Sequence, residues 1–187
     1  MSTSNTALIV MDLQPAILSG IPEGTLTALL NRIRKAIETA HRNKIPVIYV
    51  ALSFRPGAPE VSADNSFFSA ARSRFDSQHF GAIHPDVAPK VGDIVVYKKR
   101  FSAFTGSDLE VVLRGLNARH LVLAGVSTSG VVLSTTREAA DKDYQLSILT
   151  DGCHDADEEV HRMLITKVLP KQAQMLSIDE WSDSLTC

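Results

Sequence analysis

Short apolar runs alternate with amphipathic segments along most of the chain. Five runs are too short for ordinary helices and predict buried strands, at residues 7–11, 47–52, 94–97, 120–124 and 146–149. Residues 174–177 predict a shorter sixth strand. Between these runs, apolar side chains recur at the spacing of one helix face, which predicts helices over residues 26–37, 109–116, about 126–143 and 160–168.

The predicted strands are apolar on both faces, which is typical of a parallel sheet covered by helices on both sides. The sequence therefore predicts an α/β fold, a three-layer αβα sandwich with a central, mostly parallel six-stranded sheet (Rossmann-like). Right-handed crossovers bring the carboxyl ends of such strands to one edge, and ligands bind outside that edge. Asp12, Lys98, residues 125–131 and Asp151 follow predicted strands, so we expect them around one cleft.

Residues 53–90 form a long excursion that breaks this pattern. They contain four prolines, show poor periodicity and predict only a short helix near residues 67–72. Loops of this length inside a compact domain commonly carry function, so we interpret the excursion as a pocket cover or an interface arm. If its phenylalanines are exposed, they favour a homodimer or higher homo-oligomer; if they are not, they cover the chain's own cleft. These phenylalanines are Phe67, Phe68, Phe75 and Phe80.

Composition limits the classes of partner. The chain has 187 residues, enough for a single domain over 1–187 with its own core. A net charge of -2 gives no reason to expect nucleic acid or an anionic membrane surface, and no apolar run is long enough to span a bilayer. Residues 1–6 lack the basic region and cleavage site of a signal peptide. Cys153 and Cys187 make no disulfide framework, so a reducing cytoplasm is the expected location.

Two charged side chains come directly after predicted strands. Asp12 there can act as a partly desolvated general acid or base, although an Asp that caps a turn is common. Lys98 can pair with Asp12 and stabilise developing negative charge, although surface lysines are mostly just solvated. Position alone leaves both alternatives open.

Residues 125–131 (GVSTSGV) link a predicted strand to a predicted helix. The first amides of a helix can form an anion site or oxyanion hole. The alternative is an ordinary turn with Thr128 or Ser129 as the N-cap. The segment matches neither a Walker loop nor a dinucleotide fingerprint, and the histidines show no metal-ligand spacing, so we expect no cofactor and no metal.

Four motifs give the chain a resemblance to a known family. Residues 7–14 (ALIVMDLQ), 98–109 (KKRFSAFTGSDL) and 121–135 (LVLAGVSTSGVVLST) resemble its opening strand, lysine motif and nucleophile motif, and residues 150–161 match the segment that follows. In this order and spacing, the chain resembles the isochorismatase-like hydrolases, or cysteine hydrolase superfamily, over residues 7–173.

The resemblance implies a catalytic triad of Asp, Lys and Cys. The first two carry over to Asp12 and Lys98, but the nucleophile position holds Val131, which cannot attack a carbonyl. The resemblance also implies a cis peptide at Val126–Ser127 and backbone groups around the substrate oxygen, at Val126, Ser127, Thr128 and Gly130. Substitute nucleophiles would have to come from Ser127, Ser129, Ser134 or Cys153.

The function implied is a hydrolase acting on a small molecule without the usual Cys nucleophile. Isochorismatases proper add water to a vinyl ether without a thiol, and Asp12 with Lys98 could perform that acid–base chemistry. The alternative is a catalytically inactive small-molecule-binding or structural homologue. The candidates for lining the pocket are Phe54, Arg55, Arg100 and Phe104, with Arg55 or Arg100 as a possible anchor for a substrate carboxylate.

Overall fold

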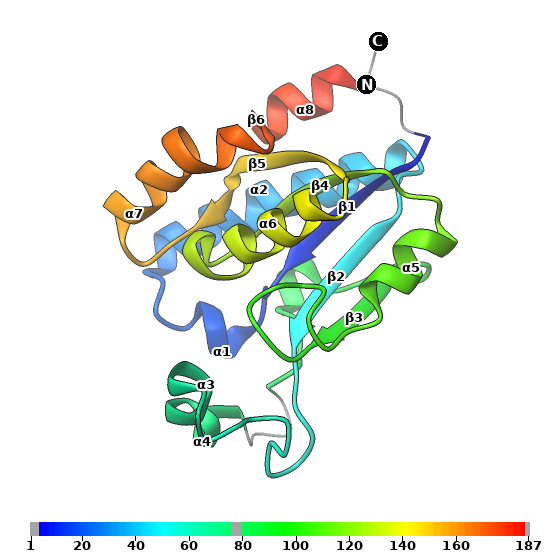
Figure 1. Ribbon diagram of the computed structural model, residues 1–187. Helices are drawn as coiled ribbons and strands as arrows, with labels where there is room; N and C mark the ends of the chain where they lie inside the picture. Colours follow the sequence, from blue (N-terminus) through cyan, green and yellow to red (C-terminus); the bar gives the residue numbers. More distant parts are fainter. Residues whose placement is uncertain (1–3, 76–79, 186–187) are drawn as a thin grey trace.

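The computed structural model describes residues 4–75 and 80–185, and it is built on one six-stranded, fully parallel sheet (Figure 1). The strand order is β3-β2-β1-β4-β5-β6. The strands are β1 (Thr6–Met11), β2 (Val47–Leu52), β3 (Ile94–Lys98), β4 (His120–Val126), β5 (Gln145–His154) and β6 (Gln174–Leu176). The predicted fold class is thereby confirmed.

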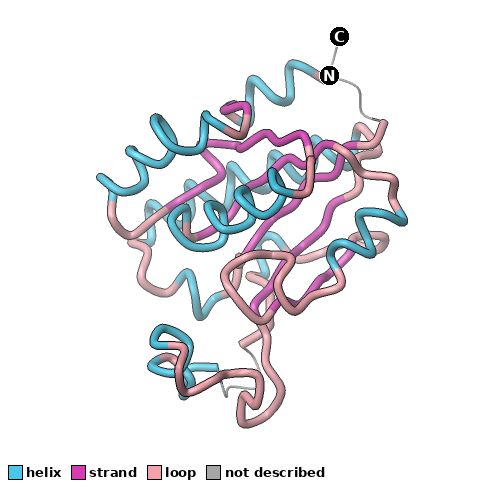
Figure 2. The backbone as a smooth tube through the Cα atoms, in the orientation of Figure 1, coloured by secondary structure: helices cyan, strands magenta, loops and turns pink. Residues whose placement is uncertain are grey.

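Helices cover both faces of the sheet (Figures 1 and 2). The first face carries α1 (Pro15–Leu18), α2 (Glu23–Arg42) and α8 (Ile178–Ser184), with a 3-10 turn at Pro85–Val87. The second carries α5 (Leu109–Gly115), α6 (Leu133–Asp141) and α7 (Glu158–Met163), the last continued by π and 3-10 turns at Leu164–Val168 and Leu169–Lys171. Among the described residues, no helix is long and apolar enough to cross a membrane.

The continuous apolar runs of the central strands follow from burial on both sides. In β1, Ala7, Ile9 and Met11 pack into the core beneath α5 and α6, whereas Leu8 and Val10 pack into the core beneath α2 and α8. Successive side chains of a strand point to opposite faces, so a strand between two helical layers must be apolar at every position.

A glycine permits the close approach of the two central strands. Gly125, near the end of β4, pairs with Met11 of β1. A Cβ at this position would clash with the backbone carbonyl of Met11, and the φ of +153° is one that L side chains rarely adopt. A side chain here would therefore push β4 away from β1 at the sheet edge where ligands bind.

The excursion between β2 and β3 stands apart from the sandwich (Figure 1). It contains α3 (Ser66–Ala70) and α4 (Arg72–Phe75) where one short helix is predicted, and most of the remainder is loop (Figure 2). It packs on a small core of its own, made of Leu52, Ala58, Val61, Phe68 and Phe80. The side chain of Phe75 lies outside the described residues.

Candidate active site

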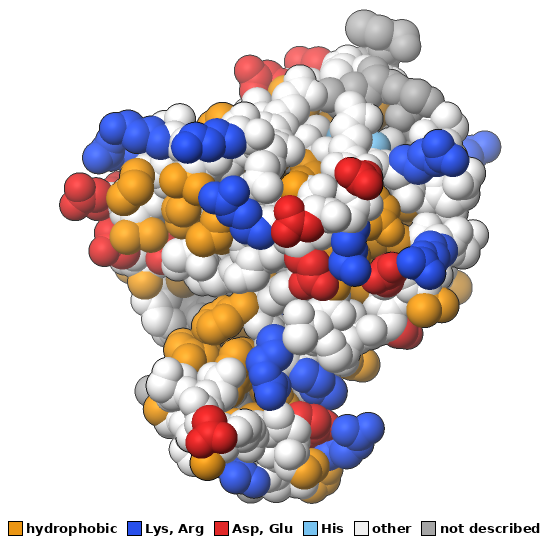
Figure 3. Space-filling model, in the orientation of Figure 1, with side chains coloured by type: hydrophobic (Ala, Val, Ile, Leu, Met, Phe, Trp, Pro, Cys, Tyr) orange, Lys and Arg blue, Asp and Glu red, His pale blue; other side chains and the backbone are white. Residues whose placement is uncertain are grey.

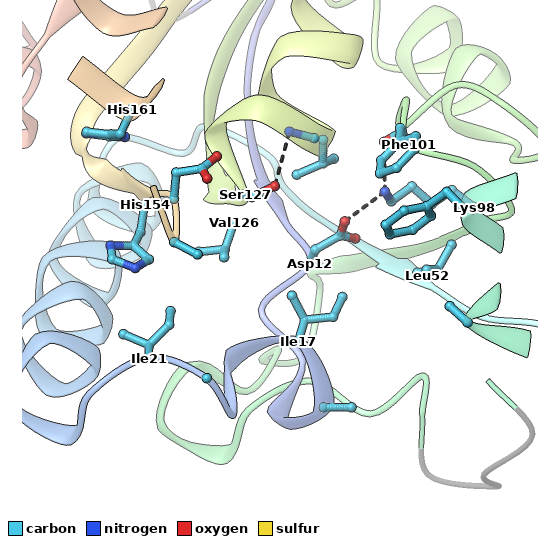
Figure 4. A pocket seen from close by; sticks show the side chains of 18 of the residues that line it. Asp12, Ile17, Ile21, Leu52, Lys98, Phe101, Val126, Ser127, His154 and His161 are labelled. Atoms are coloured by element: carbon cyan, nitrogen blue, oxygen red, sulfur yellow. Dashed lines mark hydrogen bonds and ion pairs between the residues drawn. The ribbon is translucent and has the colours of Figure 1, made fainter. Parts of the chain in front are cut away.

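The strand order locates the site. Connections from β1 and β4 leave the sheet in opposite directions, and such a reversal opens a crevice at the carboxyl ends of the strands. A pocket of about 920 Å³ lies there, lined by residues that follow β1, β3, β4 and β5 and by α3 of the excursion (Figure 4). Phe67, Phe68 and Phe80 line it, so this part of the excursion forms a wall of the pocket.

Asp12 and Lys98 form an ion pair at the base of this pocket, as predicted. Lys98 Nζ lies 2.8 Å from Asp12 Oδ2 and also donates to the Phe101 carbonyl at 2.8 Å. Figure 4 shows the two side chains pointing toward each other. The strands that carry them are not adjacent, because β2 lies between β1 and β3, and the long lysine side chain spans the gap.

Burial sets the charge state of this pair. Asp12 and Lys98 are only 6% and 1% exposed. Desolvation raises the pKa of Asp12 to about 6, although the Lys98 charge and hydrogen bond pull it down. Desolvation likewise lowers the pKa of Lys98, against the opposing effect of Asp12. Asp12 Oδ1 is buried and has no hydrogen-bond partner in the described structure, so one oxygen of the carboxyl group remains free to exchange a proton with a ligand.

The expected nucleophile position offers no nucleophile. Val131 is 1% exposed and lines the pocket, within a π turn at Thr128–Val132 that precedes α6. Cys153 is buried, and desolvation raises the pKa of its thiol to about 12, which suppresses the reactive thiolate. The Ser127 hydroxyl lines the pocket, but its oxygen accepts a hydrogen bond from the Gly130 amide at 3.1 Å.

The turn after β4 is held by side chains from the segment after β5. The Val126–Ser127 peptide is cis, as predicted. Asp155 Oδ2 accepts a hydrogen bond from the Ser129 amide at 2.7 Å, and Thr128 Oγ1 is 2.8 Å from His161 Nδ1.

These contacts revise the expected anion site. The amides of Ser129 and Gly130 already donate to Asp155 and Ser127, and Thr128 is fully buried and does not line the pocket. Val126, Ser127 and Gly130 do line it.

Of the four residues predicted to line the pocket, only Arg100 does so. Phe54 packs edge-on against Phe68, with ring centroids 6.1 Å apart. The Arg55 side chain is 72% exposed and pairs with Glu60 at 2.7 Å. Phe104 is buried and stacks on Tyr144. The prediction is therefore wrong for Phe54, Arg55 and Phe104, because the two rings pack against other aromatic side chains and the arginine faces solvent.

The contribution of β5 also differs from the prediction. Asp151 does not reach the pocket, because the strand continues past it to His154 and its carboxylate accepts hydrogen bonds from Arg32 and from the Ile178 amide. The pocket instead receives His154, Asp155 and His161. Burial lowers the pKa of His161, and neighbouring His154 lowers it further. Two sequence signals pointed to this segment, its position after the predicted strand at residues 146–149 and the family match over residues 150–161, but neither singled out these three side chains.

Fold and site together define a Rossmann-like α/β protein with a small-molecule pocket that carries a buried carboxylate–ammonium pair. The sequence profile of the Isochorismatase domain matches residues 6–180. The chain belongs to the isochorismatase family of hydrolases.

Individual relatives cover nearly the same span. An uncharacterized isochorismatase family protein, YecD, of Escherichia coli O157:H7 is 30% identical over 99% of this chain and 98% of its own length. The ureidoacrylate amidohydrolase RutB of Stutzerimonas stutzeri is 29% identical over 85% of this chain and 73% of its own. An isochorismatase family protein from Burkholderia thailandensis superposes with a TM-score of 0.86 at 25% identity, covering 100% of this chain and 98% of that one.

Proposed function

We propose that the protein is a hydrolase of a small molecule that works by acid–base catalysis through Asp12 and Lys98, without a protein nucleophile. The observation that carries the proposal is the buried Asp12–Lys98 pair at the pocket, with the pKa of Asp12 raised to about 6. A carboxyl group tuned to this range is suited to donate and recover a proton near neutral pH. Val131 at the position of the family nucleophile supports water as the attacking group.

Addition of water to a vinyl ether fits this set of groups. Asp12 protonates the terminal alkene carbon, which leaves a cation stabilised by the ether oxygen. Water adds to that cation and returns a proton to the Asp12 carboxylate, and the resulting hemiketal separates into a ketone and an alcohol. Lys98 stabilises the carboxylate while it lacks its proton.

The test is turnover on a matched panel of vinyl ethers, ureides and amides. We expect hydrolysis of a vinyl ether, with product detected by mass spectrometry. The relative RutB is named for an amide-cleaving activity, so ureides form the second arm. Absence of turnover across the panel, together with binding of its members, would instead support the catalytically inactive binding homologue.

The thiol dependence of activity separates the two mechanisms. We expect iodoacetamide to leave turnover unchanged, because Cys153 is buried with a pKa raised to about 12. We also expect the protein with its own Val131 to hydrolyse the vinyl ether, so that this activity does not require the substitution Val131→Cys. Loss of turnover on alkylation, with protection of Cys153 by substrate, would replace water addition by a displaced cysteine mechanism. An inert wild-type protein that gains amidase activity with Val131→Cys would favour the binding homologue.

The pH profile reports the protonation state of Asp12. As a proton donor, Asp12 acts only in its protonated form, which predominates below its pKa of about 6. We therefore expect kcat/KM for the vinyl ether to be constant at low pH and to fall about tenfold per unit as the pH rises through about 6. Initial rates across the range in which circular dichroism shows the folded protein would check this. A kcat/KM that rises through the same range would assign Asp12 the role of base.

A further inference from the structure

A buried glutamine lies just behind the site. Gln14 is fully buried and does not line the pocket. We propose that Gln14 is a positioning residue, whose side-chain amide fixes the distance between Asp12 and Lys98 and holds the pocket wall beside them. This role rests on the function proposed for Asp12. A buried amide is unfavourable unless it is hydrogen-bonded, so the partners of Gln14 carry the inference.

The side-chain amide of Gln14 bonds to three backbone groups. Its Oε1 accepts a hydrogen bond from the Leu52 amide at 2.7 Å, and its Nε2 donates to the Leu52 carbonyl at 2.9 Å. Nε2 also donates to the Phe80 carbonyl. Both N–H donors of the amide are thereby used, and the reversed orientation would set its oxygen against two carbonyl oxygens. One orientation of the side chain therefore joins three segments of the backbone.

The contact with Leu52 replaces a backbone hydrogen bond between β1 and β2. The Asp12 amide donates to the Val50 carbonyl at 2.8 Å. In a continued parallel ladder, the Leu52 amide would next donate to the Asp12 carbonyl. Asp12 instead has a φ of +58°, so the chain leaves the strand direction at this residue, and the Leu52 amide donates to Gln14. The Gln14 side chain therefore holds the turn that carries Asp12 against the end of β2.

The end of β2 also determines where Lys98 lies. Leu52 is the residue opposite Lys98 in the pairing of β2 with β3. The ion pair spans β2, so a movement of this end would change the distance between Asp12 and Lys98. Figure 4 shows Leu52 on the same side of the pocket as the pair. Since Gln14 is bonded to both backbone groups of Leu52, it holds the two charged residues at a fixed separation.

The third hydrogen bond of Gln14 holds the excursion. Leu52 directly precedes the excursion, and Phe80 lies in its returning segment, after α3 and α4. Both side chains line the pocket and belong to the small core that also contains Phe68. Figure 3 shows hydrophobic side chains gathered where the excursion meets the main body. Because one amide bonds to both ends of this segment, the pocket wall keeps its position relative to the ion pair.

A change at Gln14 should reach the Asp12 carboxyl group through Lys98. The charge and the hydrogen bond of Lys98 both lower the pKa of Asp12, so a wider separation should raise that pKa. Other charged or titratable side chains also line the pocket, namely Arg100, His154, Asp155, Glu158 and His161. Within the described chain, Gln14 bonds to none of them.

Gln14→Met tests the proposal, because methionine has a similar length and volume but cannot form the three bonds. Carbon-13 NMR of the full-length protein would follow the titration of the Asp12 carboxyl carbon, assigned by its absence in Asp12→Asn. An opposite charge in contact lowers a carboxyl pKa by about 1–3, so we expect the wider pair to move the inflection about one pH unit higher. We also expect kcat on the vinyl ether to fall by up to about 10²-fold, as for a small misplacement of a catalytic group.

Ser147→Ala is the matched control. Ser147 is fully buried, lies 2.9 Å from His120 Nε2 and belongs to the amino-terminal part of β5, away from the pocket. The substitution removes a buried hydrogen bond and should leave the Asp12 inflection unchanged. An unchanged inflection in Gln14→Met, or an equal shift in Ser147→Ala, would overturn the proposal. A lower inflection would also overturn it, because Gln14 would then exclude water from the carboxyl group and not set its distance from Lys98.

Gln14→Asn is the second variant if circular dichroism shows that Gln14→Met does not fold. Asparagine keeps the amide but is one methylene shorter, so it cannot hold both Leu52 and Phe80, and the same upward shift is expected. The titration requires no turnover. An upward shift in a protein that does not hydrolyse the vinyl ether would support the positioning role and reject only the proposed function. Asp12-dependent turnover with an unchanged inflection would reject the positioning role alone.

Discussion

Asp12→Asn is expected to lower kcat on the hydrolysed substrate by roughly 10²–10⁴-fold, the range for loss of a general acid–base group. The amide keeps the size of the carboxyl group but cannot donate and recover a proton. The effect should fall on kcat more than on KM, because the shape of the pocket is retained and the loss appears in the transition state. Single-turnover rates with the wild-type protein alongside would measure it.

Asp151→Asn supplies the control for this substitution. Asp151 also lies near the end of a strand of the same sheet, but its carboxylate is bound to Arg32 and the Ile178 amide and does not line the pocket. We expect its turnover to stay within a few-fold of the wild type. Circular dichroism should show that both variants fold, since Asp12→Asn leaves Lys98 buried without its partner. Similar losses in the two variants would mean that Asp12 supports the fold and not the reaction.

The parts of the fold that the sequence predicted are those set by local periodicity. In β1 and β4, alternate residues are buried on opposite faces, so their apolar runs are unbroken and indicate parallel strands. Once the strands are parallel, Asp12 and Lys98 must lie at the same edge, and the ion pair follows.

The errors arose where tertiary pairing overrides the local pattern. The register of pairing between β4 and β5 shifts between Leu123 and Gly125. Leu123 pairs with Ile148, whereas Gly125 pairs with Cys153. This irregularity extends the strand to His154, turns Asp151 toward α2 and brings His154 to the pocket. No spacing in the sequence indicates such a shift.

The excursion was predictable as a unit but not in detail. Phe54, Phe67 and Phe68 have the same chemistry and are close in sequence, yet Phe54 packs on Phe68 while Phe67 faces the pocket. Without a repeating pattern, the direction of each side chain depends on contacts across the segment. The homo-oligomer stays a prediction, and a pocket wall made of Phe67 and Phe68 accounts for part of the aromatic content that motivated it.

Lys98→Met is expected to destabilise the protein by about 3–5 kcal/mol at pH values well above 6, the range for removing one partner of a buried ion pair. Methionine fills most of the volume of the lysine stem, so the loss comes from charge and not from a cavity. Without Lys98, the buried Asp12 carboxylate would have no counter-charge on Oδ2, and its Oδ1 already has no hydrogen-bond partner in the described structure.

The pH dependence identifies this cause. Lys98 lowers the pKa of Asp12 in the wild-type protein, so its removal should raise that pKa above about 6. Asp in the unfolded chain ionises near pH 4, at about 3.9. Between these values the folded variant holds a proton that the unfolded chain has released, and each rise in pH favours unfolding. The free energy of unfolding of Lys98→Met should therefore fall as the pH rises from about 4 through the raised pKa, and its deficit relative to the wild type should be small at about pH 4.

Urea unfolding of wild-type and variant proteins at about pH 4.5 and about pH 8 would measure both free energies of unfolding, with circular dichroism as the probe. Lys99→Met is the matched control, because Lys99 is the next residue and its ammonium donates to the Ser53 carbonyl without facing a buried carboxylate. We expect it to lose about 1 kcal/mol at either pH, as for a single hydrogen bond. An equal deficit for Lys98→Met at both pH values would show that packing dominates at this position. A deficit that grows with pH, absent from Lys99→Met, would establish that Lys98 holds the charged form of Asp12 in the pocket.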